Sequence, residues 1–180
     1  MITRVSALIG AAALAGGTFA GGATSALARG SAAHVAAAPS MAQITARMKH
    51  TIEIGTRGEY FKPVGKPLTV KDGRGTGTIT AAIGVRWPTA DAKGQIVFFW
   101  HNSSFNSMSA DYETPAVIKL AAPAAGTFAI TYAHYKASDP LCCPSLKPVV
   151  VNYGWGSDNM LISDGVPPHA GKKVLVKYQP

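Results

Sequence analysis

Residues 95–101 read QIVFFWH and contain five consecutive apolar side chains. A strand that is apolar at successive positions, rather than at alternate ones, is typical of a strand buried on both faces. Residues 78–87, TITAAIGVRW, are a second strand candidate, and segment 88–94 between the two has the proline and glycine of a turn. The two runs therefore predict a β-hairpin whose second strand lies in the middle of a sheet.

Further strands are predicted downstream of this hairpin. Residues 127–135 and 148–155 alternate between large apolar and smaller or polar side chains, which is the two-residue period of a strand. Shorter strand candidates flanked by turn residues lie at 116–120, 160–163 and 173–178. Strands at close intervals, separated by Gly, Pro, Asn and Asp, predict a mainly β fold, either an antiparallel meander or a small barrel-like sheet.

Upstream of the hairpin the pattern is mixed. Residues 41–54 contain few helix breakers and repeat apolar residues at a spacing of four, which predicts one short helix capped by Ser40. Residues 51–54 fit a strand equally well. Residues 55–77 are rich in glycine and proline and are predicted to be mostly loop, with a short strand at 68–70. An α+β arrangement is therefore the alternative to the mainly β fold.

The first 28 residues have the features of a secretory signal peptide. A positive charge precedes an apolar run at 5–19, and the small-residue motif Ala26-Leu27-Ala28 follows it. Ala28 is the favoured cleavage site, with Ala33 and Ala38 as alternatives. Glycines interrupt the apolar run, which argues against a membrane anchor. The segment therefore predicts a secreted or extracytoplasmic protein of the cell envelope.

The remainder of the chain is predicted to be a disordered Ala-rich lead-in at 29–40 and a single β-rich domain at 41–180. The formal net charge is +8, from 17 Lys and Arg against 9 Asp and Glu. These basic residues are scattered, whereas a nucleic-acid-binding protein usually gathers them on one face or tail. We therefore expect no specific nucleic acid as partner. The expected partners are anionic cell-envelope polymers or a membrane surface, met through long-range attraction, with no membrane-spanning segment after signal cleavage.

The chain has two cysteines, Cys142 and Cys143, and they are adjacent. This is not a C-x-x-C motif, and two thiols cannot complete a tetrahedral metal site. Pro140 and Pro144 restrict the backbone around the pair. Consecutive Cα atoms lie about 3.8 Å apart, closer than in ordinary disulfides, so a bond between neighbours is strained and more readily reduced. The pair therefore predicts a rigid corner between two strands or two buried thiols, and alternatively a redox switch or soft-metal trap.

Several short motifs surround these features: VFFWHN at 97–102, DPLCCPS at 139–145, a valine strand leading to Trp155, and VPP at 166–168. In these motifs the stretch from 95 to 168 resembles the LppP/LprE lipoprotein family of actinobacterial envelopes. The resemblance implies a small exported β-rich domain of unknown biochemical activity. Relatives are generally tethered by an N-terminal lipid, whereas this chain has no lipobox cysteine, so we expect it not to be lipidated. It also lacks the further upstream cysteine expected in many relatives.

Polar and aromatic side chains near the strand ends are candidates for a ligand surface, because aromatic faces can line a groove for sugars or peptides. The candidates are His101, Asn102, His134, Tyr135 and Trp155. The polar segment 102–113 is predicted to be a loop long enough to contact a ligand.

Other motifs favour structural roles. Asp139 and Ser145, with Pro140 and Pro144, are expected to support the turn around the cysteines. A triad of Ser145, Asp139 and either His101 or His134 would lack the nucleophile elbow. The glycine-rich GRGTG at 73–77 lacks the strand-then-helix context of a phosphate cradle.

We therefore assign no catalytic residue, metal ligand or cofactor. The expected function is that of an exported cell-envelope protein that is a non-catalytic binding or structural module with a Cys-Cys corner. The alternative is a thiol redox or soft-metal-responsive protein that uses the vicinal cysteines.

Overall fold

The computed structural model describes residues 37–54, 58–88, 94–140, 142–170 and 175–179. The predicted leader, 1–28, and most of the predicted lead-in, 29–40, lie outside the described residues. The described elements, in chain order, are α1 (Met41–Lys49), β1 (Thr51–Glu53), β2 (Tyr60–Lys71), β3 (Thr78–Trp87), β4 (Gln95–His101), β5 (Ser104–Met108), β6 (Val117–Ala121), β7 (Thr127–Tyr132), β8 (Val149–Trp155), β9 (Leu161–Ser163) and β10 (Val176–Tyr178).

Helix α1 begins at a capping box formed by Ser40 and Gln43. The backbone N–H of Gln43 donates to Ser40 Oγ over 3.3 Å, and Ser40 N–H donates to Gln43 Oε1 over 2.8 Å. These bonds satisfy backbone donors that a helix start would otherwise leave unpaired. The helix ends at Lys49, and β1 follows within two residues. Both structures that the pattern allowed in 41–54 are therefore present, one after the other.

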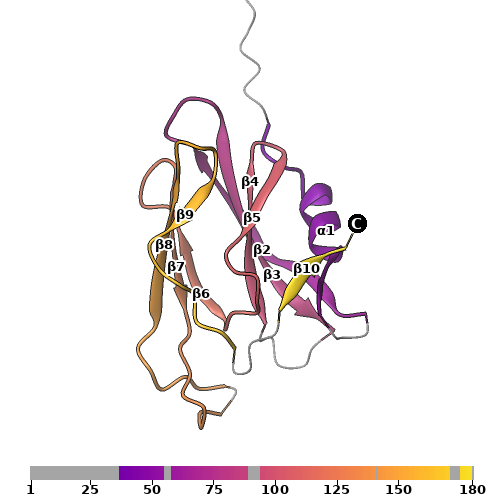
Figure 1. The fold of residues 1–180 in the computed structure, drawn as a ribbon, viewed down its shortest axis with the longest axis vertical. Coiled ribbons are helices and arrows are strands. Elements are labelled where there is room, and N and C mark those ends of the chain that lie inside the picture. Colours follow the sequence, from indigo (N-terminus) through magenta and orange to yellow (C-terminus); the bar gives the residue numbers. More distant parts are fainter. Residues whose placement is uncertain (1–36, 55–57, 89–93, 141, 171–174, 180) are drawn as a thin grey trace, which may run out of the picture. The chain divides into compact units, whose positions relative to one another are not determined.

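The strands form two antiparallel sheets (Figure 1). The first sheet has the order β10-β1-β2-β3-β4-β5, and the second has the order β6-β7-β8-β9. Consecutive strands of the second sheet pair as hairpins, with Phe128 opposite Tyr153 and Ile130 opposite Val151. The mainly β, antiparallel fold with one short helix is confirmed, and its strands are divided between two sheets rather than forming one.

The apolar strand β4 is buried on both faces because it lies between two cores. Val97 and Phe99 point into the core between the two sheets, together with Phe128 and Ile130 of β7. The alternate side chains point to the other face of the first sheet and pack against α1 in a second core, which contains Ile44, Met48, Phe61, Ala82, Ile96, Phe98, Trp100 and Val176. Residues at successive positions of a strand face opposite sides, so a run without alternation needs two apolar surroundings.

Segment 55–77 was expected to be mostly loop, and this expectation is wrong for most of it. Strand β2 occupies Tyr60–Lys71 and pairs with β3 along its length. The register shifts between Val64 and Leu68, at the positions that hold Gly65 and Pro67. A proline has no N–H for the ladder, so a strand accommodates it where the ladder is interrupted. Residues 55–57 lie outside the described part of the chain.

Segment 102–113 was also expected to be a loop, but it contains β5. The β4–β5 hairpin turns at Asn102 and Ser103. Asn102 adopts φ 54°, in the left-handed region that asparagine tolerates better than most residues. Strand β7 ends at Tyr132, three residues before the predicted end, so His134 and Tyr135 follow the strand instead of lying in it. Among the described residues, no helix has both the length and the apolar composition needed to cross a bilayer.

Candidate functional site

Three turns meet at one end of the two sheets, the upper end in Figure 1. They connect β2 to β3 at 72–77, β4 to β5 at 102–103, and β8 to β9 at 156–160. A cleft of about 490 Å³ lies among them. Its lining residues are Thr76, His101, Asn102, Ser103, Ser104, Phe105, Asn106, Trp155 and Asn159. We refer to this feature as the turn-end cleft.

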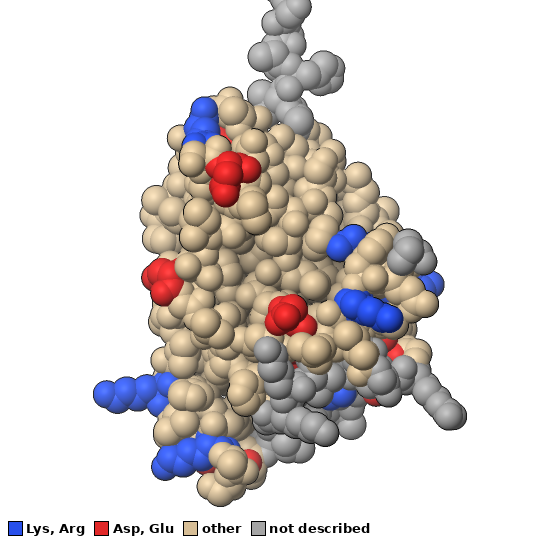
Figure 2. All heavy atoms as spheres, in the orientation of Figure 1, with Lys and Arg blue, Asp and Glu red and all other residues tan. Residues whose placement is uncertain are grey.

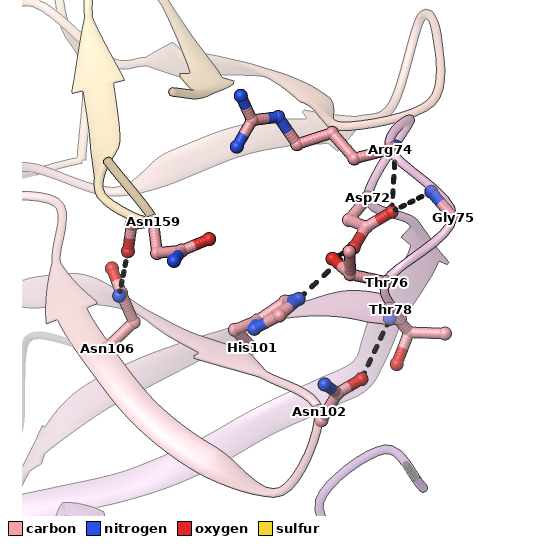
Figure 3. Close-up of polar contacts among 9 residues, drawn as sticks. All are labelled: Asp72, Arg74, Gly75, Thr76, Thr78, His101, Asn102, Asn106 and Asn159. Atoms are coloured by element: carbon pink, nitrogen blue, oxygen red, sulfur yellow. Dashed lines mark hydrogen bonds and ion pairs between the residues drawn. The ribbon is translucent and has the colours of Figure 1, made fainter. Parts of the chain in front are cut away.

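Asp72, directly behind the cleft, organises the β2–β3 turn. Its side chain is buried, with 2% of its surface exposed. Oδ1 accepts the backbone N–H groups of Arg74, over 2.9 Å, and of Gly75, over 3.0 Å. Oδ2 accepts the hydroxyl of Thr76 and lies 3.2 Å from His101 Nε2 (Figure 3). These donors replace the water molecules that the carboxylate lost when it was buried on folding.

The ionisation of Asp72 follows from these contacts. Burial alone would raise the pKa of Asp72, because it disfavours the charged form. The hydrogen bonds from Thr76, the Arg74 N–H, His101 and the Gly75 N–H outweigh burial and hold the pKa well below its usual range. An ionised carboxylate only accepts hydrogen bonds, so His101 Nε2 carries the hydrogen and donates it.

His101 is held on its other side by Trp155. The two rings stack with centroids 4.5 Å apart and planes 27° from parallel. His101 is the last residue of β4 in the first sheet, and Trp155 is the last residue of β8 in the second. The stack therefore joins the two sheets at the cleft, and His101 is fixed between an aromatic face and a carboxylate.

Gly126 supports the same junction from the β6–β7 turn. Its N–H donates to Lys71 O over 2.7 Å, and its carbonyl accepts the N–H of Trp155 over 2.9 Å. A Cβ at Gly126 would lie 2.5 Å from the backbone oxygen of Asp72, and the residue has φ 70°. Both facts require glycine here.

The other walls of the cleft are amide, hydroxyl and phenyl side chains. Asn102 ties the β4–β5 turn to the start of β3, since its Oδ1 accepts the N–H of Thr78 over 3.0 Å (Figure 3). Asn106 Nδ2 donates to the carbonyl of Asn159 over 3.1 Å and so ties β5 to the β8–β9 turn. Phe105 is held from behind by Arg47, whose guanidinium lies 3.6 Å from its ring centroid.

The structure divides the predicted ligand surface between the two ends of the sheets. His101, Asn102 and Trp155 come together at the turn-end cleft. His134 and Tyr135 follow the opposite end of β7, in the loop 133–148 that carries the cysteines (Figure 1). We refer to this loop as the cysteine loop.

In the cysteine loop, Cys142 and Cys143 are bonded to each other as a vicinal disulfide, and both residues are exposed. Asp139 accepts the N–H of Lys136 over 2.7 Å, the N–H of Ser145 over 2.9 Å and the hydroxyl of Ser145 over 2.8 Å. These bonds, led by the Ser145 N–H, lower the pKa of Asp139. The loop is therefore closed by one carboxylate around the disulfide.

The triad of Ser145, Asp139 and His101 considered from the sequence is not assembled in the structure. Asp139 bonds to Ser145, while His101 bonds to Asp72 at the other end of the sheets. Several residues at or behind the cleft were not predicted from the sequence, namely Asp72, Thr76, Phe105, Asn106 and Asn159. An Asp that precedes a glycine-rich turn with a hydroxyl four residues on is a local signal for Asp72.

A second, mainly apolar depression of about 610 Å³ lies on the sheet of β6–β9. Gly154 lines it, and a Cβ there would meet nothing within 4 Å. Its one carboxylate, Asp164, is engaged by the N–H and the amide of Asn152, over 2.8 and 2.7 Å. It offers fewer polar groups to a ligand than the turn-end cleft does.

Charged side chains are sparse on the face shown in Figure 2. Lys and Arg side chains occur there at separate places, with a wide uncharged surface between them. No group of three or more His, Cys, Asp or Glu within the described ranges is arranged to hold a metal ion. The described residues that line the turn-end cleft include no Lys, Arg, Asp or Glu.

The fold and the cleft define a two-sheet antiparallel β domain with a cleft of about 490 Å³ among its turns. Residues 76–158 match the model of the LppP/LprE lipoprotein family, which confirms the resemblance over these residues. The match begins before β3 and ends after β8, so it includes His101, Trp155 and both cysteines, while Asp72 lies just outside it. A lipoprotein family indicates an envelope location. Neither the curated proteins nor the solved structures gave a match.

Proposed function

We propose that this protein is an exported, non-catalytic glycan-binding module of the cell envelope and that the turn-end cleft holds the ligand. The observation that carries the proposal is the lining of the cleft, where the His101–Trp155 stack lies among amide and hydroxyl side chains. Aromatic rings beside hydrogen-bonding groups suit ligands that have both apolar ring faces and hydroxyls, as sugars do.

The hydrogen bonds of the two aspartates support a role without catalysis for them. Asp72 and Asp139 each bond with both carboxylate oxygens to neighbouring groups of the protein. A carboxylate engaged in this way orders its turn. His101 and the amides remain as groups that contact a ligand.

The basic composition supports an additional, non-specific contribution. With a net charge of +8, the chain is attracted over long range to anionic cell-envelope polymers or membrane surfaces. This attraction raises the rate of encounter and is weakened by salt. Recognition in the uncharged cleft depends on hydrogen bonds and ring contacts, so it is expected to persist at high salt.

The test is binding to purified cell-envelope polysaccharide, measured by co-sedimentation at 0.1 and 0.5 M NaCl. Asn106→Ala removes a cleft amide, and Ser157→Ala, an exposed residue of the β8–β9 turn outside the lining, is the matched control. We expect Asn106→Ala to weaken binding about fivefold, the effect of one hydrogen bond, and Ser157→Ala to leave it unchanged. Equal binding by both variants, together with loss of binding at 0.5 M NaCl, would show that charge alone is responsible.

One observation favours a second candidate, a thiol redox protein. A redox role requires accessible sulfurs, and both cysteines of the disulfide are exposed. An external dithiol would attack one Sγ, release the other as a thiolate and then leave as its own disulfide, so that two electrons and two protons reach the pair.

The test of this candidate is the intact mass of the native protein after alkylation, with and without a mild dithiol. Two alkyl groups added only after mild reduction would support the redox role. A disulfide that resists alkylation until strong reductant is added would support a structural corner instead.

A further inference from the structure

The turn-end cleft contains one histidine nitrogen that the protein leaves available. His101 Nε2 is engaged by Asp72, over 3.2 Å. Nδ1 lies on the side of the ring away from Asp72 (Figure 3) and has no hydrogen-bond partner in the part of the chain that the structure describes. With the hydrogen on Nε2, a neutral imidazole presents Nδ1 as an acceptor.

The tautomer is set by the surroundings of Asp72. Its carboxylate also accepts two backbone N–H groups and the hydroxyl of Thr76, and these hold it in place behind the ring. The stack on Trp155 fixes the plane of the ring. Asp72 is therefore a positioning residue, and His101 is the residue that touches the ligand.

A second polar atom of the stacked pair also lacks a partner. Trp155 Nε1 is buried and finds no acceptor among the described residues, although Trp155 lines the cleft. Because Trp155 Nε1 is itself buried, the stacked pair offers a ligand one acceptor, His101 Nδ1, and is complementary to a group that donates a hydrogen bond. A hydroxyl is such a group.

The charge behind the cleft selects against anionic ligands. Asp72 is ionised and buried behind His101, and no Lys or Arg is among the described residues that line the cleft. A carboxylated or phosphorylated sugar would bring a second negative charge toward Asp72, and the described lining residues include no cation to compensate it, Arg74 being on the β2–β3 turn outside the lining. A neutral sugar carries the required hydroxyls without this cost.

We infer that Asp72 holds His101 in the Nε2–H tautomer so that Nδ1 accepts a hydrogen bond from a hydroxyl of a neutral sugar in the turn-end cleft. This inference rests on the proposed function, and it assigns the ligand class and the contact that selects it. Anionic polymers are then attracted by the basic chain as a whole and not by this cleft.

The first measurement is the tautomer of His101 in the full chain, read from ¹⁵N chemical shifts of the imidazole ring at pH 8. We expect the pattern of a neutral ring protonated at Nε2. A ring protonated at Nδ1 would overturn the inference, because Nδ1 would then be a donor. This measurement does not depend on ligand binding and requires no variant that could fail to fold.

The second measurement is calorimetric binding of neutral oligosaccharides of glucose, galactose and mannose, with oligogalacturonate as the anionic comparison. For the neutral sugar that binds best, single deoxy derivatives are then compared on the wild type, His101→Phe and Trp155→Phe. We expect one deoxy derivative to bind the wild type five- to tenfold more weakly, and to bind His101→Phe no more weakly than the parent sugar does. Trp155→Phe should weaken the parent sugar by a similar factor.

The possible failures separate the inference from the proposed function. Binding of envelope polysaccharide that no deoxy substitution and neither variant weakens would refute the inference and leave the proposed function standing. Tighter binding of oligogalacturonate than of every neutral oligosaccharide would refute the neutral ligand class. Absence of binding to any glycan would refute both proposals.

Discussion

Two aspartates at opposite ends of the sheets each order a turn by accepting hydrogen bonds, but their surroundings differ. Asp72 and Asp139 each accept two backbone N–H groups and one hydroxyl within a turn. Asp72 is 2% exposed and also holds His101, whereas the hydrogen bonds of Asp139 lie in an exposed loop. Hydrogen-bond number alone therefore does not distinguish the two sites, but burial does.

This difference in burial predicts at which of the two aspartates the stability of the fold depends on a single side chain. If Asp139 is removed, water can reach the donors that it leaves. If Asp72 is removed, its donors lose an acceptor in hydrogen bonds that are part-buried, and the His101–Trp155 stack loses the group that fixes one ring. The turn-end cleft is therefore expected to be sensitive to substitution and the cysteine loop tolerant of it.

The largest expected effect is that of removing Asp72. Asp72→Ala should lower the free energy of unfolding by about 3 kcal/mol, because the donors of several part-buried hydrogen bonds lose a charged acceptor. Asp72→Asn should lower it by about 2 kcal/mol, since one oxygen remains but the charge is lost. Urea titration followed by tryptophan fluorescence measures both. Asp139→Asn is the matched control, and an equal loss in that variant would break the comparison.

The next effect is the pH dependence that Asp72 gives to stability. The folded-state pKa of Asp72 lies below its unfolded value of about 4, so ionised Asp72 stabilises the fold above that pH. This contribution is lost as the pH falls from about 4 through the folded-state pKa. The stability gap of about 2 kcal/mol between wild type and Asp72→Asn should therefore narrow when urea titrations are run at pH 3 instead of pH 7. A gap of constant size would show that charge is not what stabilises the site.

Much of the fold could be predicted from the sequence because strand periodicity reports local burial. β4 reads as doubly buried, and the alternation of β7 and β8 reads as one buried face. β2 and β5 could not be predicted in the same way. Their glycine, proline, serine and asparagine residues resemble loop residues, and their strand structure depends on pairing with β3 and β4.

The candidate site could be predicted only in part, because it too depends on contacts between residues far apart in the chain. His101, Asn102 and Trp155 stand at strand ends, where a sequence pattern can suggest a surface. Their convergence depends on how the two sheets pack, and the partner of His101 is 29 residues away in the chain. His134 and Tyr135 were grouped with them because a strand to 135 was expected, whereas β7 ends at Tyr132.

Two glycines in buried and open surroundings allow a similar comparison of substitution effects on stability. A Cβ at Gly84 of β3 would lie 2.7 Å from Phe98 Cε2 in the core, whereas a Cβ at Gly154 of β8 would meet nothing within 4 Å. Gly84→Ala should lower the free energy of unfolding by about 1 to 3 kcal/mol through overpacking. Gly154→Ala should raise it by about 0.5 kcal/mol, because it reduces the entropy of the unfolded chain. Thermal melting of the two variants would refute this reasoning if both shifted in the same direction.

The smallest effect is expected at the cysteine loop. Replacing Cys142 and Cys143 together by serine should lower the free energy of unfolding by about 1 kcal/mol or less, because a bond between neighbours closes almost no chain and so restricts the unfolded state little. Glycan binding should be unchanged, since the loop follows the end of β7 opposite to the turn-end cleft. Melting temperature and co-sedimentation on the same preparation test both statements. Unchanged melting with lost binding would reverse the roles of the two ends, because the cysteine loop would then be the functional surface and the cleft a structural junction.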